Sequence, residues 1–285
     1  MIGFVMLSVA SAGLALVGLA LLRREPVPVA TNYRGRRLRV VLGLAVGFAV
    51  SALAAFAYIL ASHWSPLRLA GGIGLGYWVG AMLVLLAGWY DDARTGLRRG
   101  LAGHLGGLVR GQITPGIVKL VAIVLAALAV AVDASTGLGR DILGIGVMAG
   151  SANLWNLLDV RPGRCLKAFL VAAVALAPFA ARHDPVVVPS AFGAAVLVLP
   201  IDLGERAMLG DAGSNLLGFV LGVGLFLALP LWGLAVVFAV VLVLHYVAET
   251  TTFSRVIERS PALRRFDQLG RGGRAKRRID PSGPL

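Results

Sequence analysis

The chain is poor in charged residues and in cysteine. Only 14% of its 285 residues are Asp, Glu, Lys or Arg, whereas 58% are hydrophobic. Soluble domains carry about 25% charged residues, so the composition excludes an ordinary soluble domain and indicates an integral membrane protein. The single cysteine, Cys165, excludes an internal disulfide, and we interpret it as a small apolar packing residue.

Nine apolar runs approach the length of about 20 residues that a helix needs to cross a bilayer. They cover residues 2–22, 38–61, 68–89, 116–132, 142–158, 165–180, 186–201, 213–230 and 232–248. We therefore expect an all-α, polytopic transmembrane helical bundle of about nine spans in residues 1–249, followed by a basic cytoplasmic tail in residues 250–285. The first run has no basic residue before it and Arg23 and Arg24 after it, which is the reverse of a cleaved signal peptide.

The basic residues predict the orientation of this bundle. Alternate loops, beginning with residues 23–37, and the tail contain 24 of the 27 Lys and Arg residues. Because basic loops stay in the cytoplasm, we expect the N-terminus outside and the C-terminus inside the plasma (inner) membrane. The net charge of +13 then belongs mainly to the cytoplasmic face, where it attracts anionic lipid. The basic run 274–278 lacks aromatic or base-reading residues, so no nucleic-acid partner is expected.

Four carboxylates lie where apolar runs meet loops on the cytoplasmic side. Asp91 and Asp92 follow the third run, Asp159 follows the fifth, and Asp211 precedes the eighth. Ionisable groups at a membrane bundle are costly and mark function, and carboxylates combined with phosphates are the ligands that Mg²⁺ prefers. Simpler explanations are a solvated helix end for the Asp91–Asp92 pair and helix capping for Asp211. We favour a metal–phosphate site.

The fifth run ends in a polar stripe. Asn153, Asn156 and Asp159 are spaced by three residues, so they share one helical face. Such side chains need partners inside a membrane protein. They provide either hydrogen bonds between helices or the polar wall of a substrate site, and we favour the wall.

Other residues nearby are suited to binding phosphate. The turn Arg161-Pro162-Gly163-Arg164 offers two guanidinium groups. Lys119 can reach either lipid headgroups or a bound phosphate. Backbone amides at a helix start bind phosphate readily, and the eighth run begins with such a segment, Gly210-Asp211-Ala212-Gly213-Ser214. The long loop 93–115, rich in Gly and Arg, is expected to be functional.

Two runs carry small residues at four-residue spacing, which permits close approach between membrane helices. We expect the third and eighth helices to pack closely through these stripes and to bring Asp91 and Asp92 towards Asp211. Homodimerisation through one stripe is a competing use. The stripes are Gly72, Gly76 and Gly80 in the third run and Ser214, Gly218 and Gly222 in the eighth.

On these residues the chain resembles the polyprenyl-phosphate N-acetylhexosamine-1-phosphate transferase superfamily, which includes phospho-N-acetylmuramoyl-pentapeptide transferase (glycosyltransferase family 4). The likeness covers roughly residues 20–230. Its motifs are the DD pair after the third span, Asn-x-x-Asn-x-x-Asp after the fifth, and Gly-Asp-x-Gly-Ser before the eighth, all present here in that order.

The resemblance implies an enzyme of cell-wall biogenesis that transfers sugar-1-phosphate from a UDP-linked amino sugar to polyprenyl (undecaprenyl) phosphate and releases UMP. The implied cofactor is Mg²⁺, with Mn²⁺ as an alternative ion, held by Asp211 and Asp92. Asp91 and Asp92 would orient or deprotonate the lipid phosphate. The implied substrate-binding residues are Lys119, Asn153, Asn156, Asp159, Gly210, Gly213 and Ser214, with Arg161 and Arg164 as further phosphate contacts.

The chain also departs from the family pattern. Pro162 stands where the family has a second acid, and no histidine follows His245, so the His-rich motif of the last cytoplasmic loop is absent. These departures favour an alternative, a catalytically silent homologue that scaffolds or regulates envelope glycan synthesis. A transporter or flippase is a third hypothesis; it predicts acids or broken helices near mid-membrane, yet the runs contain almost no charge between their ends.

Overall fold

The computed structural model describes residues 1–63, 74–94, 114–134, 136–183 and 185–271, and this part of the chain is almost entirely helical. The expected all-α class is confirmed, and each of the nine apolar runs contains a helix. These helices are α1 (Ile2–Leu21), α2 (Leu42–His63), α3 (Leu75–Ala93), α5 (Pro115–Ala134), α6 (Leu138–Leu158), α7 (Arg164–His183), α8 (Val187–Leu203), α9 (Gly210–Ala228) and α10 (Leu231–Thr250).

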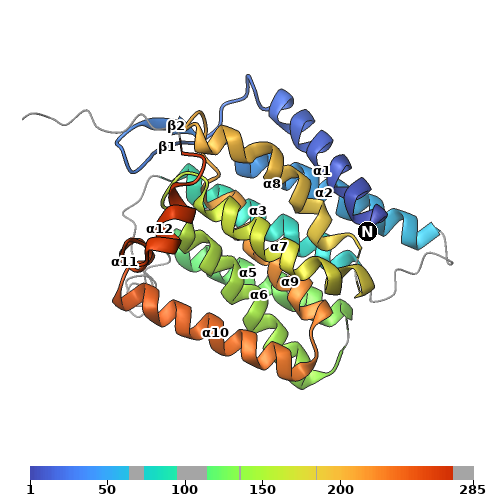
Figure 1. Ribbon diagram of the computed structural model, residues 1–285. Coiled ribbons are helices and arrows are strands. Elements are labelled where there is room, and N and C mark those ends of the chain that lie inside the picture. Colours follow the sequence, from blue (N-terminus) through green and yellow to red (C-terminus); the bar gives the residue numbers. More distant parts are fainter. Residues whose placement is uncertain (64–73, 95–113, 135, 184, 272–285) are drawn as a thin grey trace, which may run out of the picture.

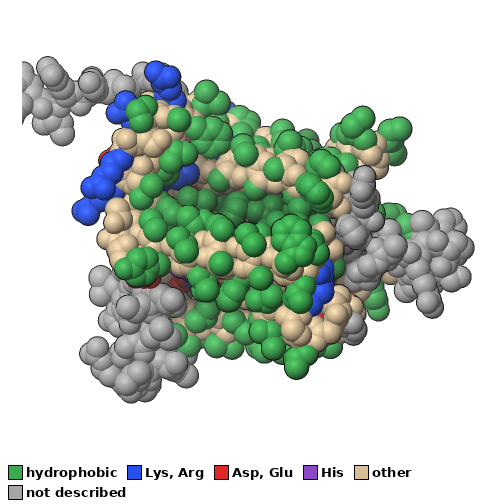
Figure 2. Space-filling model, turned by 60° about the horizontal axis from the view of Figure 1, so that its bottom comes forward, with side chains coloured by type: hydrophobic (Ala, Val, Ile, Leu, Met, Phe, Trp, Pro, Cys, Tyr) green, Lys and Arg blue, Asp and Glu red, His purple; other side chains and the backbone are tan. Residues whose placement is uncertain are grey.

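Five helices of the described ranges are long and apolar enough to cross a membrane: α1, residues 42–60 of α2, α5, α9 and α10. The surface agrees with a membrane protein, since hydrophobic side chains cover most of the face in Figure 2, whereas Lys and Arg gather mainly at its left-hand end. Water cannot pair with backbone groups inside a bilayer, and a helix satisfies these groups internally. The count of nine spans and the orientation stay predictions.

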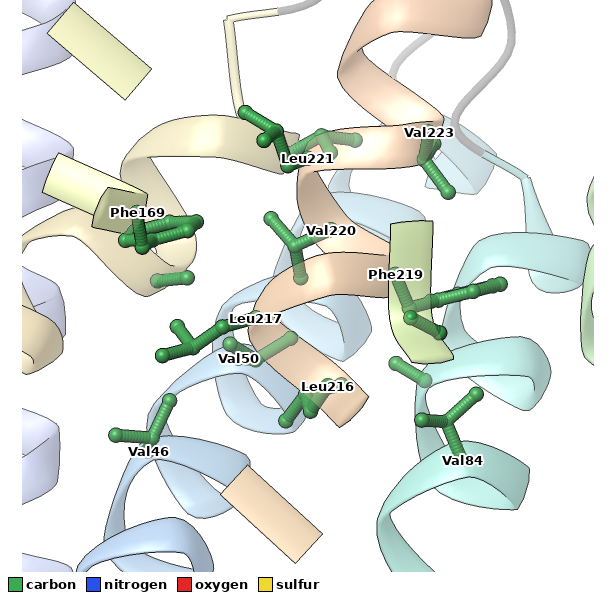
Figure 3. Packing of buried hydrophobic residues seen from close by; sticks show 14 of the residues in the cluster. Val46, Val50, Val84, Phe169, Leu216, Leu217, Phe219, Val220, Leu221 and Val223 are labelled. Carbon is green, nitrogen blue, oxygen red and sulfur yellow. The ribbon is translucent and has the colours of Figure 1, made fainter. Parts of the chain in front are cut away.

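Helix α9 forms the centre of the bundle. It packs against α2, α3, α6, α7 and α8, and Figure 1 shows α1, α2 and α8 on one side of it and α10 on the other. In Figure 3, Leu216, Leu217 and Phe219 of α9 point towards different neighbours, among them Val46 of α2 and Val84 of α3. Because α9 is enclosed on most sides, its first turn is held firmly at one end of the bundle.

The glycine stripes have other partners than the sequence suggested. A Cβ atom at Gly76 or Gly80 would meet the backbone of α5, and one at Gly222 would lie 2.7 Å from the Met148 Cα of α6. The expected close packing of the third and eighth helices is confirmed. The stripes themselves, however, face mainly α5 and α6, although Gly80 also meets the Phe219 ring of α9; Gly72 lies outside the described residues. Helices α3 and α9 do approach closely, but at Gly88, where an added Cβ would lie 2.5 Å from the Ala212 Cα.

A small hairpin precedes α2 where the sequence suggested a loop and the start of a span. Strand β1 (Val29–Thr31) pairs antiparallel with β2 (Arg37–Arg39). Val40 then forms a parallel bridge with Met208, directly before α9. The hairpin therefore ties the start of α2 to the start of α9, at the same end of the molecule as the C-terminal helices (Figure 1).

The described part of the predicted tail folds back onto the bundle. Helix α11 (Phe253–Arg259) and helix α12 (Pro261–Gln268) follow α10. The Arg164 guanidinium, at the start of α7, donates to both carboxylate oxygens of Asp267 at 2.8 and 3.2 Å. The Lys167 ammonium donates to three carbonyl oxygens at the end of this segment, those of Phe266, Asp267 and Leu269. The basic run 274–278 and most of the loop 93–115, which the sequence predicted to be functional, lie outside the described residues.

Candidate functional site

Lys119 joins the first and third sequence motifs. Its ammonium, near the start of α5, lies 2.6 Å from the Asp91 Oδ2 atom and 2.5 Å from the Asp211 Oδ2 atom. Asp91 belongs to the last turn of α3 and Asp211 to the first turn of α9. All three side chains are largely shielded from solvent, so the ion pairs act in a medium of low polarity. Two carboxylates thus converge on one cation.

Asp92 has a different role from its neighbour. Its two carboxylate oxygens accept hydrogen bonds from the backbone N–H groups of Asp211 and Ala212, both at 2.9 Å. Asp92 therefore caps α9 from another helix, and its negative charge lies at the positive end of the helix dipole. Sequence reasoning gave the capping role to Asp211, whose own side chain instead meets Lys119.

Glycine is required where the first turn of α9 packs against α2 and α3. Gly210 has a φ of +71°, a left-handed conformation that side chains disfavour, and an added Cβ would lie 2.8 Å from the Asp92 Oδ2 atom. At Gly213 an added Cβ would lie 2.6 Å from the Gly43 Cα of α2. Both glycines of the third motif thus allow close packing around Asp211.

The polar stripe of α6 divides among different partners. The Asn156 amide donates to the Ser214 Oγ atom at 3.1 Å, and Ser214 donates to the Gly210 carbonyl at 2.8 Å. Asn153 pairs with the His245 Nε2 atom of α10 at 2.9 Å. These contacts bring Asn156 to the first turn of α9, whereas Asn153 links α6 to α10, as the helix–helix explanation expected.

His245 is a polar residue whose role the sequence did not reveal. Its Nδ1 atom lies 2.8 Å from the Val241 carbonyl oxygen. Since a carbonyl only accepts, Nδ1 carries the proton and Nε2 accepts from the Asn153 amide. A histidine inside an apolar run needs such a partner, and this requirement was the available signal.

A pocket of about 340 Å³ lies beside this cluster, between the hairpin, the segment after α6 and the segment before α9. The Arg161 guanidinium lies 4.8 Å from the centre of the Tyr33 ring at this pocket. Buried Glu205 accepts a hydrogen bond from the Asn32 amide at 3.0 Å. The lining residues are Thr31, Asn32, Tyr33, Leu38, Asp159, Val160, Arg161, Pro162, Asp202, Glu205, Ala207, Met208 and Leu209.

The two arginines of the Arg161–Arg164 turn have separate roles. Arg161 lines the pocket, whereas the Arg164 guanidinium is buried and bonded to Asp267 and Ser254. Gly163 donates its N–H to the buried Asp202 carboxylate at 2.6 Å and has a φ of +70°. Asp202 therefore fixes the turn that places Arg161 at the pocket, while Arg164 anchors α12 in this arrangement.

A divalent cation has a limited but suitable set of ligands at the cluster. In the described residues no three His, Cys, Asp or Glu side chains form a metal-holding group. Mg²⁺, however, commonly uses one or two carboxylates together with substrate phosphates and water, and Asp91 and Asp211 already converge on the Lys119 cation. One turn further along α9, the Asn215 amide donates to the Asp211 carbonyl, and its fully buried Oδ1 atom has no hydrogen-bond partner among the described residues. The two converging carboxylates supply oxygen donors, the kind of ligand that Mg²⁺ prefers.

The structure thus brings together Asp91, Asp92, Lys119 and Asp211, with Asn156 beside them, while Asp159 and Arg161 line the neighbouring pocket. Leu209 borders the pocket and lies two residues before Asp211, so both regions share one end of α9. Comparison of the chain with protein-family models, with curated proteins and with solved structures finds no match.

Proposed function

We propose that the chain is a Mg²⁺-dependent transferase that moves sugar-1-phosphate from a UDP-linked amino sugar to polyprenyl phosphate at the cytoplasmic membrane face. The observation that carries this proposal is the convergence of Asp91 and Asp211 on one cation at the end of an apolar helical bundle. Phosphoryl transfer depends mainly on positioning and on stabilising charge, and this cluster offers both.

The reaction needs one P–O bond to form and one to break. An oxygen of the lipid phosphate attacks the phosphorus that bears the sugar, the bond to the bridging oxygen breaks, and UMP leaves with that electron pair. The resemblance implied Asp211 and Asp92 as metal ligands, but both oxygens of Asp92 accept from the α9 backbone. We therefore assign the Mg²⁺ to Asp91 and Asp211, where it would neutralise the diphosphate. Lys119 would donate to a phosphate oxygen, and Asp92 would keep the first turn of α9 in register with α3.

The pocket beside the cluster is suited to the other end of the donor. The Arg161 guanidinium, which stacks on the Tyr33 ring, brings a positive charge to the pocket, and Asp159 adds a carboxylate to its lining. A lipid phosphate would reach the cluster from the bilayer, so the two substrates would approach from different directions. We assign the nucleotide-sugar to the pocket and the lipid phosphate to Lys119.

Release of UMP tests this function. Purified protein with Mg²⁺, undecaprenyl phosphate and a panel of UDP-sugars should release UMP from at least one donor, and Asp211→Asn should abolish the release. Asp133→Asn is the matched control, because this carboxylate accepts from the Gly76 N–H at the opposite end of α3; it should keep the activity. Absence of UMP from every donor would contradict the proposal.

A catalytically silent homologue that scaffolds or regulates glycan synthesis is the second candidate. Two observations favour it: the Lys119 ammonium occupies the space between the carboxylates, and Pro162 replaces the second acid of the family motif. A silent binder would be stabilised against heat by UDP or UMP in a Mg²⁺-dependent manner and would release no UMP. Stabilisation together with turnover would exclude it.

A further inference from the structure

Lys119 occupies the position that a divalent cation would need. Its ammonium contacts the Oδ2 atoms of Asp91 and Asp211 at 2.6 and 2.5 Å, and a Mg²⁺ ion takes carboxylate oxygens at about 2.0–2.1 Å. A metal ion shared by these two oxygens would therefore overlap the ammonium. We propose that Lys119 competes with the divalent cation for Asp91 and Asp211, so that metal binding depends on a phosphate group that takes up the displaced ammonium.

The charges around the cluster indicate that the Lys119 ammonium and a divalent cation exclude each other. Asp92 offers no ready ligand to a second cation, since both of its oxygens accept from the α9 backbone. With Lys119 in place, one positive charge already offsets part of the charge of Asp91 and Asp211. A divalent ion would add a strong repulsion at short range. Metal binding is therefore favourable only when the ammonium moves away.

The lysine side chain can make this move. Lys119 lies close to the start of α5, and 13% of its side chain is exposed. Lysine has a flexible four-carbon stem that ends in a point charge, so its ammonium can leave the carboxylates without displacing α5. A phosphate group beside the cluster would offer it new acceptors.

Coupling of this kind is reciprocal. If a phosphate group raises the affinity for the metal, the metal raises the affinity for the phosphate by the same factor. The inference rests on the proposed function only in its choice of metal and phosphate as ligands. Its consequence is a protein that binds metal weakly alone and more tightly with an anionic substrate, which limits metal binding in the absence of substrate.

Metal affinity of variants tests the competition directly. Free Mn²⁺ is measured by electron paramagnetic resonance during titration of detergent-solubilised wild type and Lys119→Met. We expect Lys119→Met to bind Mn²⁺ about tenfold more tightly, within the usual range of coupling factors. Lys167→Met is the matched control, because Lys167 is also buried but bonds carbonyl oxygens near α12; its Mn²⁺ affinity should equal that of the wild type.

Inorganic phosphate provides the second arm of this titration. It should tighten Mn²⁺ binding to the wild type several-fold, and Lys119→Met should lose most of this effect. Equal or weaker Mn²⁺ binding by Lys119→Met than by the wild type would overturn the inference. Absence of detectable Mn²⁺ binding by both proteins would overturn it too.

Chemical modification of the wild type tests the same competition without any variant, so the result does not depend on whether a variant folds. Acetic anhydride modifies neutral amines. An ammonium that is held by two carboxylates reacts slowly, because it stays protonated and has no free lone pair for the attack. Mn²⁺ should raise the acetylation rate of Lys119 several-fold, read by mass spectrometry, and leave that of Lys167 unchanged in the same sample. An unchanged rate at Lys119 under saturating Mn²⁺ would contradict competition.

The two proposals fail separately in these experiments. Competition without UMP release would leave the inference standing and reject the transferase. Release of UMP by a wild type whose Lys119→Met variant binds Mn²⁺ no more tightly would leave the transferase standing and reject the competition.

Discussion

Adjacent carboxylates in the last turn of α3 have different partners. Asp91 bonds a lysine side chain, whereas Asp92 bonds two backbone N–H groups of another helix. Successive side chains of a helix point about 100° apart, so the pair contacts both α5 and α9. Because Asp91 and Asp92 have different partners, single substitutions can distinguish their roles.

Removal of the cap should reduce stability more than removal of its neighbour. Asp92→Ala leaves the first N–H groups of α9 without their acceptor, and we expect a loss of about 1–2 kcal/mol in the free energy of unfolding. Asp91→Ala leaves Lys119 paired with Asp211 and should cost less. Unfolding in increasing concentrations of sodium dodecyl sulfate, followed by circular dichroism, compares them. Equal losses would argue against a capping role for Asp92.

Single residues of the site were predictable in part. The sequence placed Asp91, Asp92 and Asp211 together because the predicted topology puts the loop after the third span and the loop before the eighth on one face, and the contacts with Lys119 and the α9 backbone agree with this. It could not identify Asp92 as the cap, because that depends on the register between α3 and α9. The burial of Arg164 was also unpredictable, since its partner Asp267 is 103 residues away.

The packing of α6 against α9 depends on residues without side chains. A Cβ at Gly218 would clash with the Ser151 carbonyl oxygen and lie 2.8 Å from the Ala152 Cα. Small residues at a fixed spacing indicated a close helix interface, but a stripe alone does not identify the partner helix. The sequence correctly indicated that α3 packs against α9, but the partner of this stripe is α6.

Glycine-to-alanine substitutions should separate the effect of a steric clash at this interface from the effect of helix propensity. Gly218→Ala adds a methyl group into backbone contact, and we expect a loss of about 1–3 kcal/mol in the free energy of unfolding, as for overpacked cores. Gly13→Ala in α1 is the matched control, because an added Cβ there has no neighbour within 4 Å. Alanine favours helix over glycine, so the control should be neutral or stabilising. A similar change in both variants would show that no clash occurs at Gly218.

The docking of α12 should depend on pH. Burial alone would raise the pKa of Asp267, but the hydrogen bonds and charges of Arg164 and Arg271 hold this pKa below its ordinary value. A carboxyl group of this kind adds stability above its unfolded pKa of about 4, and this stability is lost as the pH falls through the folded pKa. We therefore expect α12 to stay docked from about pH 7 to about pH 5 and to be released in stronger acid.

Hydrogen exchange measures this release. Amides of residues 261–268 should exchange slowly at about pH 6 and lose protection progressively as the pH falls from about 4 through the lowered pKa of folded Asp267, after correction for the intrinsic rate. Asp267→Asn should already be unprotected at about pH 6, because a neutral amide cannot form the charged bonds to Arg164 and Arg271. Full protection of these amides in Asp267→Asn at about pH 6 would rule out docking through this carboxylate.

At the scale of the whole molecule, hydrophobicity predicts where helices form but not how loops fold. All nine apolar runs contain helices, with ends shifted by a few residues; α3, for instance, continues to Ala93 and includes Asp91 and Asp92. The hairpin at 29–39 and the docked α12 were not predicted. Both depend on contacts between distant segments, such as the bridge of Val40 with Met208, which local patterns do not encode.

The orientation of the bundle in the membrane can be tested on the whole molecule. The proposed chemistry requires the carboxylate cluster to face the cytoplasm. Cys165 is 1% exposed and should resist a membrane-impermeant maleimide, so single cysteines can be introduced into an otherwise unreactive chain. Thr136→Cys, in the exposed turn before α6, should react in intact spheroplasts. Arg36→Cys, in the turn of the hairpin, should react only after permeabilisation, because positive residues hold that loop inside. The reverse pattern would place the carboxylate cluster outside the cell, away from nucleotide-sugars, and would exclude the proposed reaction there.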